Sequence, residues 1–351
     1  KNMDITTDLS SFEEKKFTIG TRASELAKVQ TYEVIDLIIA AAQIKGVTLT
    51  TDHFPVNDIS NSIGDTDQKT KLFNMGGQGV FCKQLEQELL DKTIDIGVHS
   101  MKDLPTTPVD GLTVVAIPPL KARDDIVILK SSNKHHQTLG NLPEGAIIGT
   151  SSLRRICTLK KKHPHLTIVD IRGNLNTRLR KLEEENFDAI ILAKAGVVRL
   201  GWEEKIDQVL TKSEYEYPPS QGALAVQCRS EDIATVALLK LIDNPFARRI
   251  VEAERQYLRT LEGGCSLPIS INSQVYLRDD ESKTEIFNFE EQKVEECNLI
   301  LSGTVYDRND FKNYLRHTVD GELNNWIELA KKLANELRDQ GAAEFILQAT
   351  E

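Results

Sequence analysis

The sequence has no apolar run that approaches the roughly 20 residues needed to span a bilayer, so no membrane-spanning segment is expected. Its five cysteines are widely scattered, and no two have C-x-x-C spacing. An odd number of cysteines in a chain of 351 residues fits a reducing compartment, and we expect a cytoplasmic protein. The seven histidines include no H-x-x-x-H pair, so no metal site is predicted.

Two further features are missing. The glycine-rich residues 75–79 lack the spacing of a Walker or Rossmann loop. Residues 1–16 are polar and acidic, unlike a signal or transit peptide. Because the first residue is lysine, removal of an upstream piece stays open, and with it a plastid location.

The chain lacks an excess of positive charge, because 53 acidic residues outnumber 43 lysines and arginines, and its net charge of -10 argues against general nucleic-acid binding. The charge is nevertheless uneven, because residues 150–182 contain nine basic residues and a single acid, Asp170. The basic residues are Arg154, Arg155, Lys160, Lys161, Lys162, Arg172, Arg178, Arg180 and Lys181. A strongly cationic segment in an acidic protein predicts a pocket for a small polyanion. The length predicts two or three domains.

One turn near the end of the chain places a thiol beside bare backbone. A helical pattern over residues 250–260 is stopped by Gly263-Gly264, which permit positive φ angles. Cys265 follows directly, and Pro268 prevents a new helix from starting. A sizeable group can approach such a sulfur. The alternative is a small cysteine buried in a connecting turn.

The first part of the chain predicts a strand that leads into an anion-binding helix start. Residues 17–20 form the expected strand, and a helix is predicted over 26–42. Arg22 lies between them, and Ser24 or Thr21 is positioned to cap the helix. A helix N-terminus beside an arginine favours an anion. A plain capped helix is the alternative.

A second strand delivers a Lys-Asp pair. Residues 94–98 are apolar, and Lys102 and Asp103 come shortly after them. Polar groups at the carboxyl end of a strand line the ligand crevice of an α/β sheet. The alternative is a solvated turn. A preceding helix over 81–92 carries Lys83 in its first turn, and residues 47–54 alternate as a strand does.

Three consecutive strands in the middle of the chain each end in a basic or hydroxyl-bearing turn. They are predicted at residues 146–149, 166–171 and 189–193. The residues that follow them include Thr150, Ser151, Arg154, Arg155, Arg172, Lys194, Gly196 and Arg199. Arginine forks match carboxylates bidentately, so carboxylates are the expected ligands. The alternative is a capped helix with a solvated basic face.

Two proline-containing segments mark where the chain changes lobe. Residues 118–123 are the expected crossover, and Pro218-Pro219 begins the return. After the cysteine turn, strands are predicted at 269–276 and 299–306, with an amphipathic helix over 323–339. This last part predicts a small α+β domain.

Six segments in this order resemble the porphobilinogen deaminase (hydroxymethylbilane synthase) family. They are Gly20-Thr21-Arg22-x-Ser24, His99–Thr106, Gly149–Arg155, Ile171–Leu179, Gln221–Leu224 and Leu261–Ile269. The chain departs from the family at Gln78, where a lysine is common, and in the acidic stretch 278–296, which has no clear counterpart.

The resemblance implies an α/β fold with two lobes like those of periplasmic binding proteins, a crossover hinge and a small α+β C-terminal domain. The expected boundaries are 1–120 with 221–243 for lobe 1, 121–220 for lobe 2 and 244–351 for the C-terminal domain. The resemblance also implies a dipyrromethane cofactor held as a thioether on Cys265. Four porphobilinogens are added head to tail with loss of ammonia, and hydrolysis then releases 1-hydroxymethylbilane. Nothing in the sequence suggests an obligate interface, so a monomer is expected, and the product is expected to pass to uroporphyrinogen-III synthase.

The same resemblance assigns roles to individual residues. Asp103 is the implied catalytic residue. The implied cofactor-binding residues are Lys83, Ser100, Lys102, Thr150, Ser151, Arg154, Arg155, Gly196, Gln221 and Gly222. The implied substrate-binding residues are Arg22, Ser24, Arg172, Arg178 and Arg199.

The chemistry agrees with these roles. Porphobilinogen carries an acetate and a propionate, so a growing chain accumulates carboxylates that need cations. Loss of ammonia creates a cationic pyrrole, which an oriented anion stabilises. Two alternatives stay open: a two-lobed protein that only binds a small polycarboxylate, and a regulator that binds nucleic acid through the basic helices.

Overall fold

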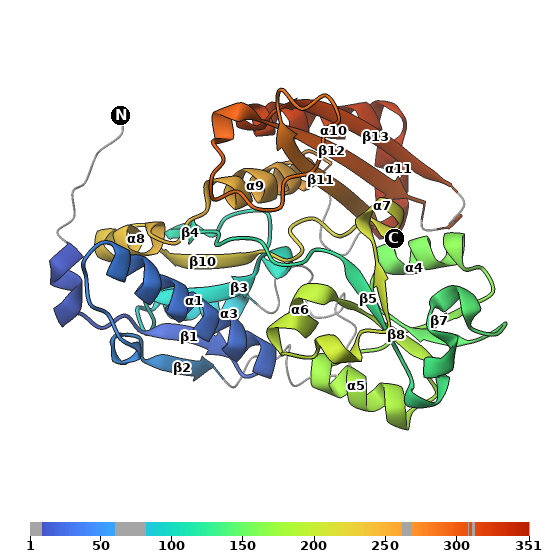
Figure 1. The fold of residues 1–351 in the computed structure, drawn as a ribbon, viewed down its shortest axis with the longest axis horizontal. Helices are drawn as coiled ribbons and strands as arrows, with labels where there is room; N and C mark the ends of the chain where they lie inside the picture. The colour runs from blue at the N-terminus through green and yellow to red at the C-terminus, as the bar shows by residue number, and fades with distance from the viewer. Residues whose placement is uncertain (1–8, 60–81, 262–267, 308, 311–312, 351) are drawn as a thin grey trace. The chain divides into compact units, whose positions relative to one another are not determined.

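The computed structural model describes residues 9–59, 82–261, 268–307, 309–310 and 313–350. The chain divides into two compact units, coloured by residue number in Figure 1. Unit 1 comprises residues 1–119 and 223–244, and unit 2 comprises residues 120–222 and 245–351. Within the described ranges, no helix has both the length and the apolar character needed to cross a membrane.

Unit 1 is built on a five-stranded sheet with the order β2-β1-β3-β10-β4. The strands are β1 Ile19–Arg22, β2 Val56–Ile59, β3 Ile96–Ser100, β4 Leu112–Ala116 and β10 Leu224–Arg229. The helices are α1 Glu25–Ile44, α3 Lys83–Leu90 and α8 Ile233–Lys240, with short 3-10 turns η1 Leu9–Glu14, η2 Thr51–His53 and η4 Met101–Asp103. The side chains of α1 and α8 pack against Ile96 and Val98 of β3, whereas Leu85 and Leu89 of α3 form a separate cluster with Ile94. The sheet is therefore covered on both faces.

Unit 2 begins with a second five-stranded sheet, of order β7-β6-β8-β5-β9. Its strands are β5 Asp125–Leu129, β6 Ile147–Gly149, β7 Thr167–Val169, β8 Ala189–Ala193 and β9 Gln208–Leu210. Its helices are α4 Leu153–Lys162, α5 Leu175–Glu184, α6 Lys194–Arg199 and α7 Lys212–Tyr215, with 3-10 turns η5 Ser131–His136, η6 Leu139–Asn141 and η7 Glu203–Lys205.

The two sheets share one topology. In unit 1, β1 pairs in parallel with β2 and β3, and β10, which enters from a crossover, pairs antiparallel with β3 and β4. In unit 2, β6 pairs in parallel with β7 and β8, and β5, which also enters from a crossover, pairs antiparallel with β8 and β9. The entering strands are β10 in unit 1 and β5 in unit 2. Because each entering strand runs antiparallel, its first residues lie at the edge where the parallel strands end.

The rest of unit 2 is an antiparallel sheet of β11 Ile269–Leu277, β12 Cys297–Tyr306 and β13 Tyr314–Glu322. Its helices are α9 Pro245–Thr260, α10 Trp326–Asp339 and α11 Ala342–Thr350, with 3-10 turns η8 Val294–Glu296 and η9 Leu323–Asn325. Tyr257 of α9, Leu299 and Leu301 of β12, and Leu333 of α10 are buried in one core. The predicted α/β fold, with two sheet-and-helix lobes and a small C-terminal α+β part, is confirmed; the predicted domain boundaries stay a prediction.

The strand predicted over residues 47–54 is wrong. Val47, Leu49 and Phe54 are buried as the alternation requires, but the backbone between them is irregular and ends in η2. The N–H of Thr48 donates to the Glu13 carboxylate at 2.6 Å, and that of Thr50 to the His53 ring at 3.0 Å. One distant and one local side-chain acceptor therefore replace the strand ladder, and β2 begins only after Pro55.

The acidic stretch 278–296 packs against the rest of unit 2. The Ile286 N–H donates to the Val275 carbonyl at 2.8 Å. Phe289 stacks on Phe246 of α9 with ring centroids 4.4 Å apart, and Glu285 forms an ion pair with Lys212 of α7. The stretch thus contacts both α9 and α7.

Candidate active site

In unit 1, the polar residues that follow β1 and β3 lie at one edge of the sheet. The strands are parallel, with Ile19 opposite Ile96, so their carboxyl ends coincide. Arg22 ends β1, Ser100 ends β3, and Lys102 and Asp103 follow in η4. All four are partly exposed. The structure therefore brings these predicted site residues to a common edge, as the strand pattern requires.

Ser24 caps α1. Its hydroxyl oxygen accepts the Ala27 N–H at 3.3 Å, which settles the choice between Ser24 and Thr21 as the N-cap. One turn further along α1, Gln30 donates to the Ser100 hydroxyl at 2.9 Å and is only 5% exposed. The sequence prediction missed Gln30. Its only signal was a polar residue on the apolar face of the expected helix.

His99 is buried beneath this edge. Burial lowers the pKa of His99 to about 4; the neighbouring Gln227 opposes the shift and the positive charge of Arg22 adds to it. Gln227 in turn donates to Glu86 of α3 at 3.2 Å. Burial raises the pKa of Glu86, while Gln227 and Lys83 oppose that rise. A row of polar side chains thus crosses the α3 face of the sheet.

This burial predicts a pH-dependent stability. The unfolded chain protonates His99 near its usual pKa of about 6.5 and the folded chain only near 4, so stability falls as the pH drops between these values and is unaffected above them. From pH 6.5 to 5, His99 is expected to remove about 2 kcal/mol of unfolding free energy. Urea titrations at both pH values should show this loss in the wild type and a smaller one in His99→Gln. In a His135→Gln control, which changes an exposed histidine, the wild-type pH dependence is expected; an equal reduction there would contradict the assignment.

In unit 2, three strand ends share an edge. β6 is parallel to both β7 and β8, so the turns after these three strands coincide at one side of the sheet. These turns, and the helices α4 and α6 that follow two of them, carry the predicted residues Thr150, Ser151, Arg154, Arg155, Arg172, Gly196 and Arg199. Thr150 and Gly196 are buried, and Arg199 is partly exposed. The predicted clustering of basic and hydroxyl groups is therefore present within this unit.

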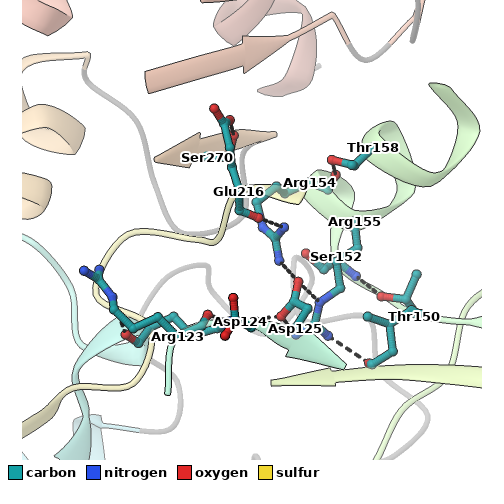
Figure 2. A network of polar contacts seen from close by, with 12 residues as sticks. Arg123, Asp124, Asp125, Thr150, Ser152, Arg154, Arg155, Thr158, Glu216 and Ser270 are labelled. Carbon is teal, nitrogen blue, oxygen red and sulfur yellow. Dashed lines mark hydrogen bonds and ion pairs between the residues drawn. The ribbon is translucent and has the colours of Figure 1, made fainter. Parts of the chain in front are cut away.

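The two adjacent arginines after β6 converge on one buried acid, Asp125 (Figure 2). Arg154 and Arg155 are 3% and 8% exposed. The Arg155 side chain donates from Nε and Nη2 to Asp125 at 3.0 and 2.8 Å, and from Nη1 to the Ile191 carbonyl. Arg154 donates to Asp125 through Nη2 and to the Glu216 carbonyl through Nη1 at 2.8 Å. Sequence reasoning missed Asp125; the available signal was one acid at the start of an otherwise apolar strand.

Other cations of the basic segment also have partners. Arg172 donates from Nε to Asp170 at 2.7 Å, and Arg178 donates to the Gly173 carbonyl at 2.8 Å. Lys161 lies 3.3 Å from the centroid of the Tyr314 ring, and Arg180 pairs with Glu184. The count of nine basic residues against one acid therefore overstates the charge offered to a ligand, because acids outside residues 150–182 enter the same region.

Two guanidinium nitrogens of this edge are buried and unpartnered within the described part of the chain. They are Nε of Arg154 and Nη1 of Arg172. A buried donor without an acceptor is costly, and few occur in native structures. A carboxylate is the acceptor that suits a guanidinium, so these two nitrogens are suited to donate hydrogen bonds to a ligand that carries carboxylate groups. The hydroxyl of Ser151 donates to the Ile171 carbonyl at 2.6 Å, so it must turn away from that carbonyl to reach such a ligand.

Gln221 and Gly222 lie on the return segment, packed against the crossover. Gln221 is fully buried and donates from Nε2 to the Arg123 carbonyl at 2.6 Å and to Asp125 at 2.9 Å. Gly222 has φ of 85°, and a Cβ there would lie 2.7 Å from the Lys121 carbonyl oxygen. The Gly222 carbonyl accepts from Arg199 at 3.4 Å. Both predicted residues thus hold the two passing segments together.

Gly222→Ala is expected to destabilise the protein more than Gly145→Ala. Both glycines have positive φ, so each substitution costs roughly 1–2 kcal/mol in backbone strain. Only Gly222 also faces a carbonyl oxygen at contact distance, whereas nothing lies within 4 Å of a Cβ at Gly145. Chemical denaturation should therefore show a larger loss for Gly222→Ala. Equal losses would mean that the crossover backbone moves aside freely.

Several predicted features lie outside the described residues: the Cys265 turn and the glycine-rich loop with Gln78. Lys83 is exposed at the first position of α3. The roles predicted for the individual site residues stay predictions.

The two sheet orders define an α/β protein of two similar lobes with an appended α+β part, and the arginines at the strand ends are of a kind that suits carboxylate ligands. Residues 17–237 match the model for the porphobilinogen deaminase dipyrromethane cofactor-binding domain, and residues 249–339 match the porphobilinogen deaminase C-terminal domain. The chain therefore belongs to the porphobilinogen deaminase family.

Curated relatives agree. The porphobilinogen deaminase of Nostoc sp. is 38% identical over 340 residues, which cover 97% of this chain and 96% of that protein. The porphobilinogen deaminase of Staphylococcus aureus strain MRSA252 is 35% identical over 338 residues, 96% of this chain and 99% of that protein. The predicted enzyme class, the predicted activity of the family and the dipyrromethane cofactor are confirmed by these matches, against the alternative of a protein that only binds ligand.

Among solved structures, the methionine-binding protein MetQ is similar over 68% of this chain and 94% of that chain, with 10% identity and a TM-score of 0.39. A YaeC-family lipoprotein from Enterococcus faecalis V583 covers 69% of this chain and 97% of that chain, with 13% identity and a TM-score of 0.37. The fold of this chain is defined by its own sheet order.

Proposed function

We propose that Asp103 protonates the leaving amine of porphobilinogen and then stabilises the cationic pyrrole that remains. Loss of ammonia breaks the bond between the aminomethyl carbon and its nitrogen, and the nitrogen leaves with the bonding electrons. The positive charge is left on the pyrrole, where an oriented carboxylate lowers its energy. Three features support Asp103: its place after β3, its partial exposure, and Arg22 and Lys102 at the same edge.

We also propose that the cofactor carboxylates are held by Lys102, Thr150, Ser151, Arg154 and Arg155, and those of the substrate by Arg22, Ser24, Arg172 and Arg178. When bound, the dipyrromethane supplies the pyrrole terminus to which substrate units are joined. The observation that carries this assignment is the pair of buried, unpartnered guanidinium nitrogens on Arg154 and Arg172. Ser24 adds a hydroxyl proton that is not needed for capping, because its oxygen acts there as the acceptor.

The attachment site is proposed to be Cys265 through a thioether. The intact mass of the purified protein is expected to exceed the chain mass by two condensed pyrrole units, and Cys265→Ser should lose this excess because serine forms no thioether. Cys297→Ser is a matched control, since Cys297 is a buried thiol of the same C-terminal part whose Sγ donates to the Lys293 carbonyl. The proposal is wrong if the wild type has the bare chain mass, or if the excess survives in Cys265→Ser.

The chain is further proposed to act as a cytoplasmic monomer whose product passes to uroporphyrinogen-III synthase. The buried thiols of Cys82, Cys157, Cys228 and Cys297 support a reducing location. Light scattering on the purified protein tests the monomer directly, and a larger mass would replace it with an oligomer.

A further inference from the structure

Asp125 is a buried acid at the edge of the unit 2 sheet where the parallel strands end. It is the first residue of β5 and is 2% exposed. In the antiparallel pairing with β8 it lies opposite Ala193, the last residue of that strand. The crossover strand therefore delivers a carboxylate to the edge at which the basic turns end.

Its carboxylate receives four donors. Oδ2 accepts from Arg154 Nη2 and from Arg155 Nε, and Oδ1 accepts from Arg155 Nη2 and from Gln221 Nε2. A carboxylate has about four lone-pair sites, so its capacity is filled. Burial opposes ionisation of this group, but the two arginine charges outweigh burial and hold the pKa of Asp125 below its usual range.

The group carries a net positive charge. Two guanidinium groups share one carboxylate, so one positive charge has no counter-ion among the described residues. Glu216 does not supply it, because its carboxylate accepts from Ser270 and pairs with Arg316 at 3.2 Å. Only the backbone carbonyl of Glu216 meets Arg154 (Figure 2).

The uncompensated charge has a directed donor. A guanidinium has five N–H groups, and Asp125 and the two carbonyls use only some of those on each arginine. Nε of Arg154 is buried without a partner in the described part of the chain. A single ligand carboxylate beside Nε of Arg154 would accept its hydrogen bond and balance the remaining positive charge.

We propose that Asp125 is a positioning residue for the two arginines. It orients Arg154 and Arg155 before any ligand is present, and it cancels one of their two charges, so that this turn binds one carboxylate arm of the pyrrole cofactor. This inference rests on the proposed function. Without Asp125, two buried like charges repel each other, and their side chains must be ordered when the ligand binds, which weakens binding.

The test is the ratio of loaded to unloaded protein, read from intact mass, in Asp125→Asn. This variant preserves the shape of the side chain and removes the charge. The ratio is expected to fall by about tenfold or more, the scale on which the outer partners of metal-ligating side chains act at metal sites. A wild-type ratio in Asp125→Asn overturns the proposal.

Asp188→Asn separates positioning from general loss of stability. Asp188 lies in the same lobe and accepts the Ile147 N–H and the Asn133 amide, both at 2.7 Å, without contacting an arginine. Its variant is expected to lower the melting temperature and keep the wild-type loading ratio. If loading falls as far in Asp188→Asn as in Asp125→Asn, the effect is structural and the proposal is wrong.

Asp125→Glu decides the question if Asp125→Asn does not fold. Glutamate retains the charge, so the chain should fold even where the asparagine variant does not, but its extra methylene moves the carboxylate and with it both guanidiniums. Reduced loading supports positioning, and wild-type loading overturns it. A wild type without any mass excess is a different outcome, because it removes the proposed cofactor attachment rather than the role of Asp125.

Discussion

Replacing Asp103 with asparagine is expected to lower turnover by about two to four orders of magnitude, the usual contribution of a positioned proton donor combined with charge stabilisation. Asparagine has almost the same shape, but it neither protonates the leaving amine nor opposes the positive charge on the pyrrole. Because Asp103 lies on the short η4 turn and is partly exposed, the substitution should leave the fold unchanged.

The measurement is the rate of ammonia release at saturating porphobilinogen, with the intact mass checked so that only loaded protein is compared. Asp110→Asn serves as the control, because Asp110 is an exposed carboxylate of the same unit, before β4. It should retain wild-type turnover. A loss of less than about tenfold in Asp103→Asn, or about 1.4 kcal/mol, would show that the proposed role is wrong.

Glu254→Gln is expected to cost roughly 3–5 kcal/mol of unfolding free energy, the typical result of removing one partner from a buried ion pair. Glu254 of α9 is fully buried and pairs with Arg123 of the crossover. It also accepts the Ser220 N–H and the Ser273 hydroxyl, each at 2.6 Å. Glutamine leaves the guanidinium without its counter-ion in a largely buried position.

Denaturant unfolding measures the loss, and Glu252→Gln is the control. Glu252 lies on the same helix and pairs with Arg259 at 3.6 Å, with both side chains partly exposed. Its variant should lose about 1 kcal/mol at most. Combining Glu254→Gln with Arg123→Met should cost less than the sum of the single variants, because the second change removes the unpaired charge. Additive losses would contradict a direct pairing.

The elements closest to the predicted site could be read from the chain because their signals are local. Ser24 caps α1, the apolar run before His99 leads into β3, and a hydroxyl or basic residue follows the end of each middle strand within three positions. In each case the order of apolar and polar residues within a few positions decides the backbone conformation. Because these signals span only a few residues, the hydroxyl and basic groups that follow each strand could be predicted from the sequence.

Elements whose cause is distant were missed. The segment 47–54 satisfies the apolar alternation of a strand, yet its backbone bonds to Glu13 and to its own side chains. β13 and α11 were not predicted. Burial alternates along β13, but its inward positions include His317 and Gly321, which break the apolar pattern, and α11 follows α10 after a single short turn. Gln30 was missed because its partner, Ser100, lies 70 positions away.

By itself, the sequence determined which charged and hydroxyl groups follow which strands, and this order was enough to indicate carboxylate chemistry and the family. Only the tertiary structure decided which of those charges are already neutralised. Asp125 meets Arg154 and Arg155, and Glu254 meets Arg123, because an antiparallel crossover strand and a C-terminal helix bring acids to arginines that are 29 to 131 positions away. Ion pairing depends on distance in space and on burial, and neither quantity can be read from spacing along the chain.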